Sequence, residues 1–177
     1  VYVAYDQDAS GGSVAPSDAA NYAELFMAYT NQSYENSHIA QRVWLVGGVD
    51  GYDHTYSDLS TSLTAARNGS ISGIHDKRNE YHADLVTFLT PYSGSSCSGL
   101  AYIQTQSSVS DFQDDAYSTM EACSFGQAIF AHELGHNMGS RHDWYIDSST
   151  TPATIAHGYV DIFNNFRTIM AYGNRCS

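Results

Sequence analysis

Apolar side chains in the first third of the chain switch between strand-like and helical spacing. Residues 1–5 alternate as in a strand, and residues 17–36 carry apolar side chains at helical spacing after Ser17, a favourable N-cap residue. The run over residues 42–48 is almost continuously apolar, which predicts a strand covered on both faces. Residues 57–68 return to helical spacing. We therefore expect a sheet with helices packed on it.

Three shorter apolar segments follow in the middle of the chain. Residues 84–89, 99–104 and 117–123 have the composition of strands, and a Pro/Gly/Ser loop separates the first two. Ser124 and Gln127 have the spacing of a capping box, which predicts that a helix begins there. The last fifth of the chain is rich in Ser, Thr, Gly and Asn, as is typical of a part built from loops.

The helix expected after this capping box carries two histidines one turn apart. His132 and His136 are four residues apart, so their imidazoles lie on one helix face and can bind one ion. Glu133 places a carboxylate beside the metal without being a ligand. Gly139 can adopt the positive-φ turn that folds the chain back and makes His142 a third ligand. Three neutral imidazoles without a fourth side chain predict a catalytic Zn²⁺ site with an open position.

The alternative interpretation is a helix whose histidines only satisfy hydrogen bonds. The full pattern H-E-x-x-H-x-x-G-x-x-H-D is expected by chance on the order of a few times per million chains of this composition. A bare H-E-x-x-H would be far weaker evidence, so the metal site is favoured. His157 is expected to be a hydrogen-bonded loop histidine and not another ligand.

The extended motif resembles the signature of the metzincin metallopeptidases, and a second segment supports the resemblance. Residues 168–172, T-I-M-A-Y, look like the Met-turn that metzincins carry beneath the metal, where Met170 would pack without being a ligand. Asp143, directly after the third histidine, resembles the adamalysin/reprolysin branch. Together, H-E-L-G-H-N-M-G-S-R-H-D-W, A-H-G-Y and R-T-I-M-A-Y-G look most like the bacterial peptidyl-Asp metallopeptidases.

The resemblance implies an α+β fold whose N-terminal part is α/β-like. In this metzincin fold, a five-stranded twisted mixed sheet, its helices and the active-site helix form an upper subdomain, here about residues 1–139. A small irregular lower subdomain with the Met-turn, here about residues 140–177, lies below the cleft. Residues 1–177 would then be one catalytic domain, in which residues 117–123 form the sheet edge that binds an extended substrate.

The resemblance also implies a secreted zinc-dependent endopeptidase. Glu133 would assist the attack of a zinc-bound water on a peptide carbonyl and return the proton to the leaving amine. Tyr172 has the Met-x-Tyr spacing that astacins and serralysins use to place a tyrosine near the metal, where it could hydrogen-bond the oxyanion; a wall or core tyrosine is the alternative. The alternative function is a catalytically silent metzincin-fold module that binds peptides or proteins.

Two arginines are candidates for substrate binding. Arg175 lies just beyond the Met-turn, where metzincins build the wall of the primed-side pocket, and Arg167 lies just before it. If the resemblance to peptidyl-Asp enzymes holds, either guanidinium could pair with an acidic substrate side chain. A surface charge or a salt-bridge partner is the alternative for both.

The chain has 19 acidic and seven basic residues, and its formal net charge is −12. Nucleic acids and anionic membranes require basic patches, so neither is expected as a partner. Protein or peptide substrates and a monomeric chain are expected instead. The scattered acids indicate a well-hydrated surface; the alternative is Ca²⁺ binding by Asp111, Asp114 and Asp115.

The cysteines give information on the redox compartment of the protein. Cys97 and Cys123 flank the strand before the active helix and could form a disulfide, which would imply an oxidising compartment. Two free buried thiols are the alternative. Cys176 is left over. The chain opens at once on a strand-like segment, so for a metzincin we expect a mature form from which signal and pro-segment have been removed.

Overall fold

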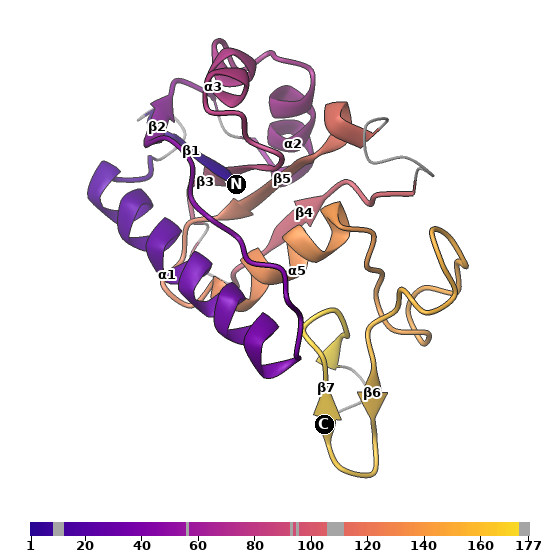
Figure 1. The fold of residues 1–177 in the computed structure, drawn as a ribbon. Helices are drawn as coiled ribbons and strands as arrows, with labels where there is room; N and C mark the ends of the chain where they lie inside the picture. The colour runs from indigo at the N-terminus through magenta and orange to yellow at the C-terminus, as the bar shows by residue number, and fades with distance from the viewer. Residues whose placement is uncertain (9–12, 56, 93, 95, 106–111, 174–177) are drawn as a thin grey trace.

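A five-stranded sheet forms the centre of the computed structural model, which describes residues 1–8, 13–55, 57–92, 94, 96–105 and 112–173. The strand order is β2-β1-β3-β5-β4 (Figure 1). The first four strands in this order run parallel, and β4 is antiparallel to β5. The strands are β1 (Tyr2–Asp6), β2 (Val49–Tyr52), β3 (Val86–Thr90), β4 (Gly99–Ala101) and β5 (Tyr117–Glu121).

Helices cover both faces of this sheet (Figure 1). On the face of α1 and α5, Phe26 and Phe130 lie with their ring centroids 5.4 Å apart in one hydrophobic core. The face of α2 and α3 holds a second core. Because successive side chains of a strand point to opposite faces, Val3 enters the first core and Tyr2 the second. The expected α+β fold around a five-stranded mixed sheet is therefore confirmed. The helices are α1 (Pro16–Asn36), α2 (Leu59–Arg67), α3 (Ile74–Glu80) and α5 (Gln127–Asn137).

The edge of the sheet nearest the candidate site is β4, so the expectation that residues 117–123 form this edge is wrong. Residues 117–121 form β5, which lies between β3 and β4, and all five of its residues are buried. Ser118 tolerates this position because its hydroxyl lies 2.8 Å from that of Thr87 on β3. Among the strands that the structure describes, β4 pairs on one side only.

The segment 42–48 does not form a strand, contrary to the expectation. The side chain of Asn31 donates to the carbonyl of Val43 over 2.9 Å and accepts from its amide over 2.8 Å. The terminal amine of Val1 donates to the carbonyl of Trp44 over 2.7 Å. These contacts satisfy backbone groups without a strand ladder, and the Trp44 side chain is 70% exposed instead of covered. The strand β2 begins only after this segment.

Two helices begin without the caps that were expected. α1 begins at Pro16, whose fixed φ suits the first helical turn, so Ser17 lies inside the helix and not at its N-cap. α5 begins at Gln127 with Gly126 at the N-cap and no capping bond from a side chain. The capping box of Ser124 and Gln127 is therefore not formed.

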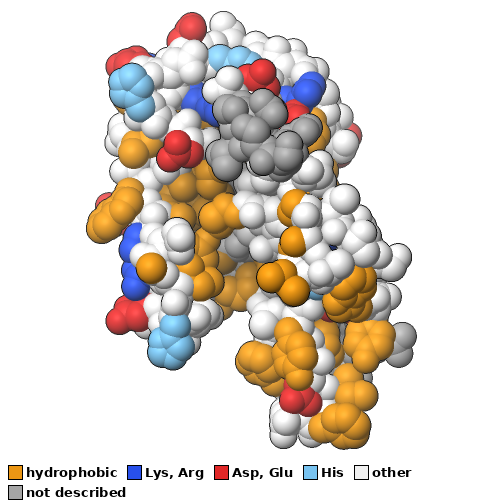
Figure 2. All heavy atoms as spheres, turned by 45° about the vertical axis from the view of Figure 1, so that its right-hand side comes forward, with side chains coloured by type: hydrophobic (Ala, Val, Ile, Leu, Met, Phe, Trp, Pro, Cys, Tyr) orange, Lys and Arg blue, Asp and Glu red, His pale blue; other side chains and the backbone are white. Residues whose placement is uncertain are grey.

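Residues 140–173 lie below α5 and have little regular structure, as expected for this part of the chain (Figure 1). Their regular pairing is a hairpin of β6 (Val160–Asp161) and β7 (Phe166–Arg167). Hydrophobic side chains gather on the surface of the lower part of the molecule (Figure 2), and Ile155 and Phe163 are 91% and 93% exposed. This part therefore has little core of its own. None of the described helices is long and apolar enough to cross a membrane.

Candidate metal centre

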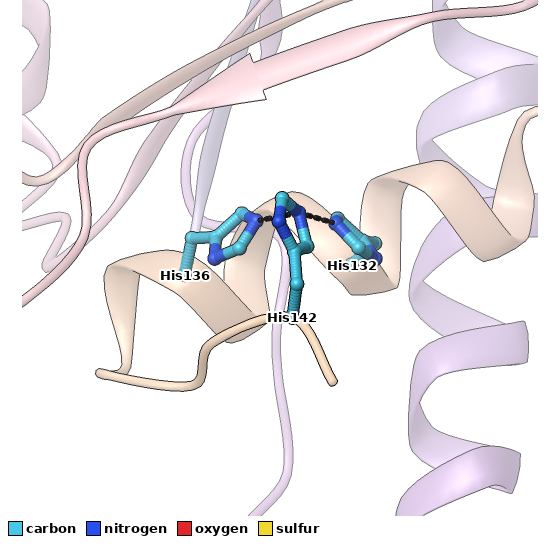
Figure 3. A group of neighbouring side chains, drawn as sticks. All are labelled: His132, His136 and His142. Carbon is cyan, nitrogen blue, oxygen red and sulfur yellow. Dashed lines mark hydrogen bonds between the residues drawn. The ribbon is translucent and has the colours of Figure 1, made fainter. Parts of the chain in front are cut away.

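Two of the three candidate ligands project from one face of α5. His132 and His136 are one turn apart, and their ring centroids are separated by 4.7 Å. Gly139, just past the helix, has φ of 91°, and its amide donates to the carbonyl of His136 over 2.9 Å. This left-handed turn reverses the chain and brings His142 back toward the other two rings (Figure 3).

The Nε2 atoms of the three histidines converge on one point. The Nε2 of His142 lies 3.1 Å from that of His136 and 3.1 Å from that of His132 (Figure 3). The Nδ1 of His132 lies 2.9 Å from the carbonyl oxygen of Ile169, and the Nδ1 of His136 lies 2.8 Å from that of Ser140. An Nδ1–H that donates to a carbonyl leaves the lone pair on Nε2. Converging lone pairs repel one another unless a cation lies between them.

The donor set fits Zn²⁺. Two nitrogens bound tetrahedrally at about 2.0–2.1 Å from zinc lie about 3.3–3.4 Å apart, close to the 3.1 Å seen here. Neutral imidazole is a preferred zinc ligand. Among the described residues, these three histidines are the one group of His, Cys, Asp and Glu side chains arranged to hold a metal ion. No fourth side chain of the described residues belongs to the group, and three protein ligands are typical of a zinc site that keeps a position for water or substrate.

The imidazoles are held in the neutral form that a metal requires. The pKa of His136 is lowered to about 4, chiefly by burial and partly by the neighbouring histidines, because adjacent imidazolium ions would repel. Burial also lowers the pKa of His132 and His142. Because these ligand atoms are already deprotonated at neutral pH, protons do not compete with the metal for them.

Glu133 is a buried acid beside the candidate ligands. It is 5% exposed, and burial raises its pKa to about 8. Together with His132 and Tyr172 it lines a cavity of about 350 Å³. A carboxyl group with a pKa in this range can take up and release a proton near neutral pH.

Asp143 and His157 hold the loop that carries the third histidine. The Oδ1 of Asp143 accepts from the amide of Tyr145 over 3.0 Å, and its Oδ2 accepts from the amide of Tyr172 over 2.9 Å. The Nδ1 of His157 lies 2.7 Å from the carbonyl oxygen of His142. The site of His142 is thus fixed by hydrogen bonds from two separate segments.

Comparison with known proteins agrees with this geometry. Residues 20–143 match the family described as metallo-peptidase family M12B, reprolysin-like. The chain belongs to this family.

Relatives of this reprolysin-like chain carry the name peptidyl-Asp metalloendopeptidase. The protein of Stenotrophomonas maltophilia (strain K279a) is 34% identical over 156 residues, which cover 84% of this chain and 36% of that protein. The protein of Xanthomonas campestris pv. campestris is 34% identical over 154 residues, which cover 84% of this chain and 35% of that protein. The chain therefore spans about a third of the length of these relatives.

The fold also occurs in a solved structure titled "Structure of a chaperone-substrate complex". The match has a TM-score of 0.67 and 21% sequence identity, and it covers 98% of this chain and 28% of that one. At this identity the similarity concerns the fold alone. With the family membership, it agrees with the metzincin-like fold that the sequence predicted.

The Met-turn of this reprolysin-like chain packs against the active helix. The amide of Ala171 donates to the carbonyl of Thr168 over 3.0 Å and closes the turn. A Cβ atom placed on Gly135 would lie 2.4 Å from the sulfur of Met170, so the sulfur occupies the space of a missing side chain. The ring of Tyr172 lies 4.4 Å from that of His142, centroid to centroid, and the residue is 44% exposed.

Of the two candidate arginines, Arg167 lines the same cavity as Glu133. Its Nη1 donates to the carbonyl of Ala171. Among the described residues it forms no salt bridge, so its positive charge is not neutralised by a carboxylate of the described chain. Arg175 lies outside the described residues.

Cys97 and Cys123 form a disulfide that closes a separation of 26 residues. Cys97 lies two residues before β4 and also lines the cavity beside Glu133. The disulfide therefore joins the entry of the edge strand to the segment before α5. Cys176 lies outside the described residues.

The acidic cluster considered for Ca²⁺ is only partly described. Asp111 lies outside the described residues. Asp115 forms a salt bridge with Arg67, which occupies one of its oxygens, and Asp114 and Asp115 do not belong to the described metal-binding group. Calcium binding stays a prediction.

Three residues of this site received no role from the sequence pattern. Gly99, at the start of β4, and Ile129, on α5, line the cavity beside Glu133. Gly135 provides the space for Met170. Gly135 lies within the H-E-L-G-H motif and could have been noticed there, whereas the contact of Gly99 with α5 depends on tertiary packing.

Proposed function

We propose that this chain is the catalytic domain of a secreted zinc-dependent endopeptidase, with residues 1–139 above the cleft and residues 140–177 below it. The observation that supports this most directly is the convergence of three imidazole Nε2 atoms beside the buried carboxyl group of Glu133. Three protein ligands with one open position are the arrangement of catalytic zinc. The names of the relatives, metalloendopeptidases, agree with this proposal.

Glu133 acts as the proton carrier of the reaction. Bound Zn²⁺ supplies the Lewis acidity that activates water and polarises the scissile carbonyl. Glu133 takes the proton from the attacking water and then donates it to the leaving amine. Its burial keeps competing water away, and its raised pKa, about 8, favours proton uptake near neutral pH.

The substrate binds in an extended conformation along the outer edge of β4. This strand has a partner on one side only among the described strands, so its other edge can pair with a peptide backbone. Such pairing uses only backbone N–H and C=O groups and does not distinguish side chains, so the specificity for side chains must come from pockets along the cleft.

Arg167 gives the cavity beside Glu133 a preference for acidic side chains on the primed side. Arg167 lines this cavity and forms no salt bridge among the described residues. A carboxylate of the substrate would provide the missing counter-charge. Arg175 is the second candidate for this role.

Tyr172 stabilises the oxyanion that forms during attack on the carbonyl. Its ring lies beside His142, and its partial exposure leaves the phenol accessible to a substrate. A hydrogen bond to developing negative charge lowers the barrier to acyl transfer. If Tyr172 is only part of the cleft wall, its replacement by Phe will leave kcat unchanged.

The disulfide supports a place outside the cytosol, because such bonds persist in oxidising compartments. Protein or peptide substrates agree with the cleft, and the net charge of −12 disfavours nucleic acids and anionic membranes as partners. We propose that the chain acts as a monomer with one catalytic zinc ion.

Digestion of casein and of quenched peptides, with and without a chelator, tests this function. Cleavage that stops with chelator and returns with Zn²⁺ is expected, and Glu133→Gln should bind zinc but cleave only at a small residual rate. A catalytically silent binding module is the alternative, and zinc binding without any cleavage would favour it. Cleavage sites mapped in a peptide library test the acidic preference, because cuts that ignore Asp and Glu would contradict it.

A further inference from the structure

Gly99, at the start of the edge strand β4, lies directly against the carboxyl group of Glu133. A Cβ atom placed on Gly99 would lie 2.7 Å from both the Cγ and the Oε1 of Glu133, and 2.8 Å from the Cγ2 of Ile129. Ordinary van der Waals contact begins at about 3.4 Å. The Glu133 side chain therefore occupies space that any other residue at position 99 would need.

The edge strand cannot withdraw to make room for a side chain. β4 is paired with β5. Just before Gly99, the amide of Ser98 donates to Oε2 of Glu121 over 2.9 Å, and the carbonyl of Ser98 accepts from the amide of Glu121 over 3.0 Å. Cys97 is held by its disulfide to Cys123. Hydrogen bonds and a covalent bond thus fix the backbone on this side of the contact.

The helix on the other side of the contact is fixed as well. Phe130 and Leu134 of α5 are fully buried, and Phe130 packs on Phe26 of α1. Displacing such side chains opens cavities in a close-packed core, which strongly destabilises a protein. The side chains of Glu133 and Ile129 both have rotatable bonds and line a cavity, so they are the groups that move when the contact is crowded.

We propose that Gly99 is a positioning residue, because the absence of a side chain there sets where the Glu133 carboxyl group lies relative to the three histidines. The inference rests on the proposed function, in which Glu133 carries the proton. A methyl group at position 99 forces the carboxyl group to move by several tenths of an ångström. A misplacement approaching 1 Å costs roughly 100-fold in rate even when binding is intact.

The variant Gly99→Ala tests this role. We expect kcat to fall roughly 100-fold, with KM changed less than about threefold and zinc content and Tm as in the unchanged protein. Gly48→Ala is the matched control, because a Cβ there would have its nearest neighbour at 3.9 Å. A rise in KM at constant kcat would overturn the proposal, since it would mean that the methyl group blocks the substrate and not Glu133.

A double-mutant cycle separates action through Glu133 from a general effect on the cleft. In the Glu133→Gln background, Gly99→Ala should lower the residual rate by less than about threefold, because the displaced group has already lost its role. A second loss of roughly 100-fold would overturn the proposal. If Gly99→Ala does not fold, the double variant Gly99→Ala/Glu133→Asp should fold and bind zinc, because Asp is shorter than Glu by one methylene. If neither variant folds, the proposal is overturned.

Crystal structures of the zinc-loaded protein and of Gly99→Ala give a readout that does not depend on activity. The carboxyl group of residue 133 should be displaced in the variant while the three histidines stay in place. An undisplaced carboxyl group overturns the positioning role whatever the activity. If the protein without any substitution binds zinc and cleaves nothing, this would instead contradict the proposed function.

Discussion

Asp143 and Tyr172, 29 residues apart in the chain, are joined by a 2.9 Å hydrogen bond from the Tyr172 amide to a carboxylate oxygen of Asp143. Asp143 directly follows the third histidine and is 1% exposed. Among the described residues after position 140, only Asp143, Gly158 and Ala171 are buried. A buried carboxylate therefore holds together a part of the molecule that lacks a hydrophobic core.

Replacing Asp143 by Ala should weaken both stability and metal binding. The variant loses two hydrogen bonds to a charged acceptor and leaves two backbone amides without their partner, which costs about 2–5 kcal/mol. Because the carboxylate also fixes the loop of His142, zinc affinity should fall about 10- to 100-fold. Thermal unfolding and competitive chelator titration measure the two effects. Asp161→Ala is the control, because Asp161 ends β6 and its carboxylate accepts from amides of the following turn. Equal zinc affinity for both variants would contradict the role of Asp143.

Removal of the metal should loosen the lower part more than the sheet. Residues 140–173 bury few apolar side chains, so a metal that links His142 to α5 contributes much of what keeps them in place. With chelator, amide exchange in this range should accelerate at least about tenfold, while β3 and β5 stay protected. Hydrogen exchange read by mass spectrometry makes the comparison. An equal acceleration in both parts would show that the metal stabilises the whole chain uniformly.

A methyl group on Gly135 should displace the Met-turn. The Cβ would lie 2.4 Å from the sulfur of Met170. The residue before Met170 is Ile169, whose carbonyl oxygen contacts Nδ1 of His132 and orients its ring. We expect Gly135→Ala to lower zinc affinity by about tenfold or more. Adding Met170→Ala removes the crowded sulfur and should restore part of that affinity. If the double variant binds zinc no better than Gly135→Ala, the contact with Met170 is not the cause.

The sequence was sufficient where the functional geometry is local. His132 and His136 are placed by the period of one helix, and the turn at Gly139 depends on a conformation that glycine adopts readily. These features require no knowledge of distant contacts, so spacing alone predicted which side chains converge.

The parts that were predicted wrongly depend on contacts between distant segments. Residues 42–48 suit a strand by composition, but the side chain of Asn31 in α1 helps hold them in an irregular path, and the strand forms at residues 49–52 instead. Short strands do not reveal their order in a sheet, so the edge position was assigned to residues 117–123 through the resemblance, whereas β4 occupies it. The polar helix α3 buries only Ile74, and its pattern gave no signal.

The cap of α2 should make stability depend on pH in the acid range. Asp58, the N-cap residue, accepts from the amide of Thr61 over 2.7 Å and from its hydroxyl, and these bonds lower its pKa below the ordinary value near 3.8. A pKa lowered by folding stabilises the protein above the unfolded pKa, and this contribution disappears as pH falls through the folded value. Asp58→Ala should therefore lower Tm by about 2–4 °C at pH 6 and by less at pH 3. A constant difference in Tm at both pH values would exclude this linkage.

Arg167 is the described residue on which the proposed acidic preference depends. If its guanidinium pairs with a substrate carboxylate, Arg167→Gln should lower kcat/KM for a peptide with Asp on the primed side roughly 10- to 100-fold. The same peptide with Asn has no charge to lose and should be cleaved at an unchanged rate. Arg167→Lys keeps the charge but loses the forked donor geometry, so an intermediate loss is expected.

Comparing the cleavage of the Asp peptide with that of the Asn peptide distinguishes a loss of specificity from damage to the site. Arg167 also donates to the carbonyl of Ala171 in the Met-turn, and a disturbed turn would slow both peptides equally. Arg42→Gln is the control, because Arg42 is exposed and bonded to the carbonyls of Ile39 and Gln41 away from the cavity. A preference for Asp that survives Arg167→Gln would exclude this residue as its source, and Arg175→Gln would then test the second candidate.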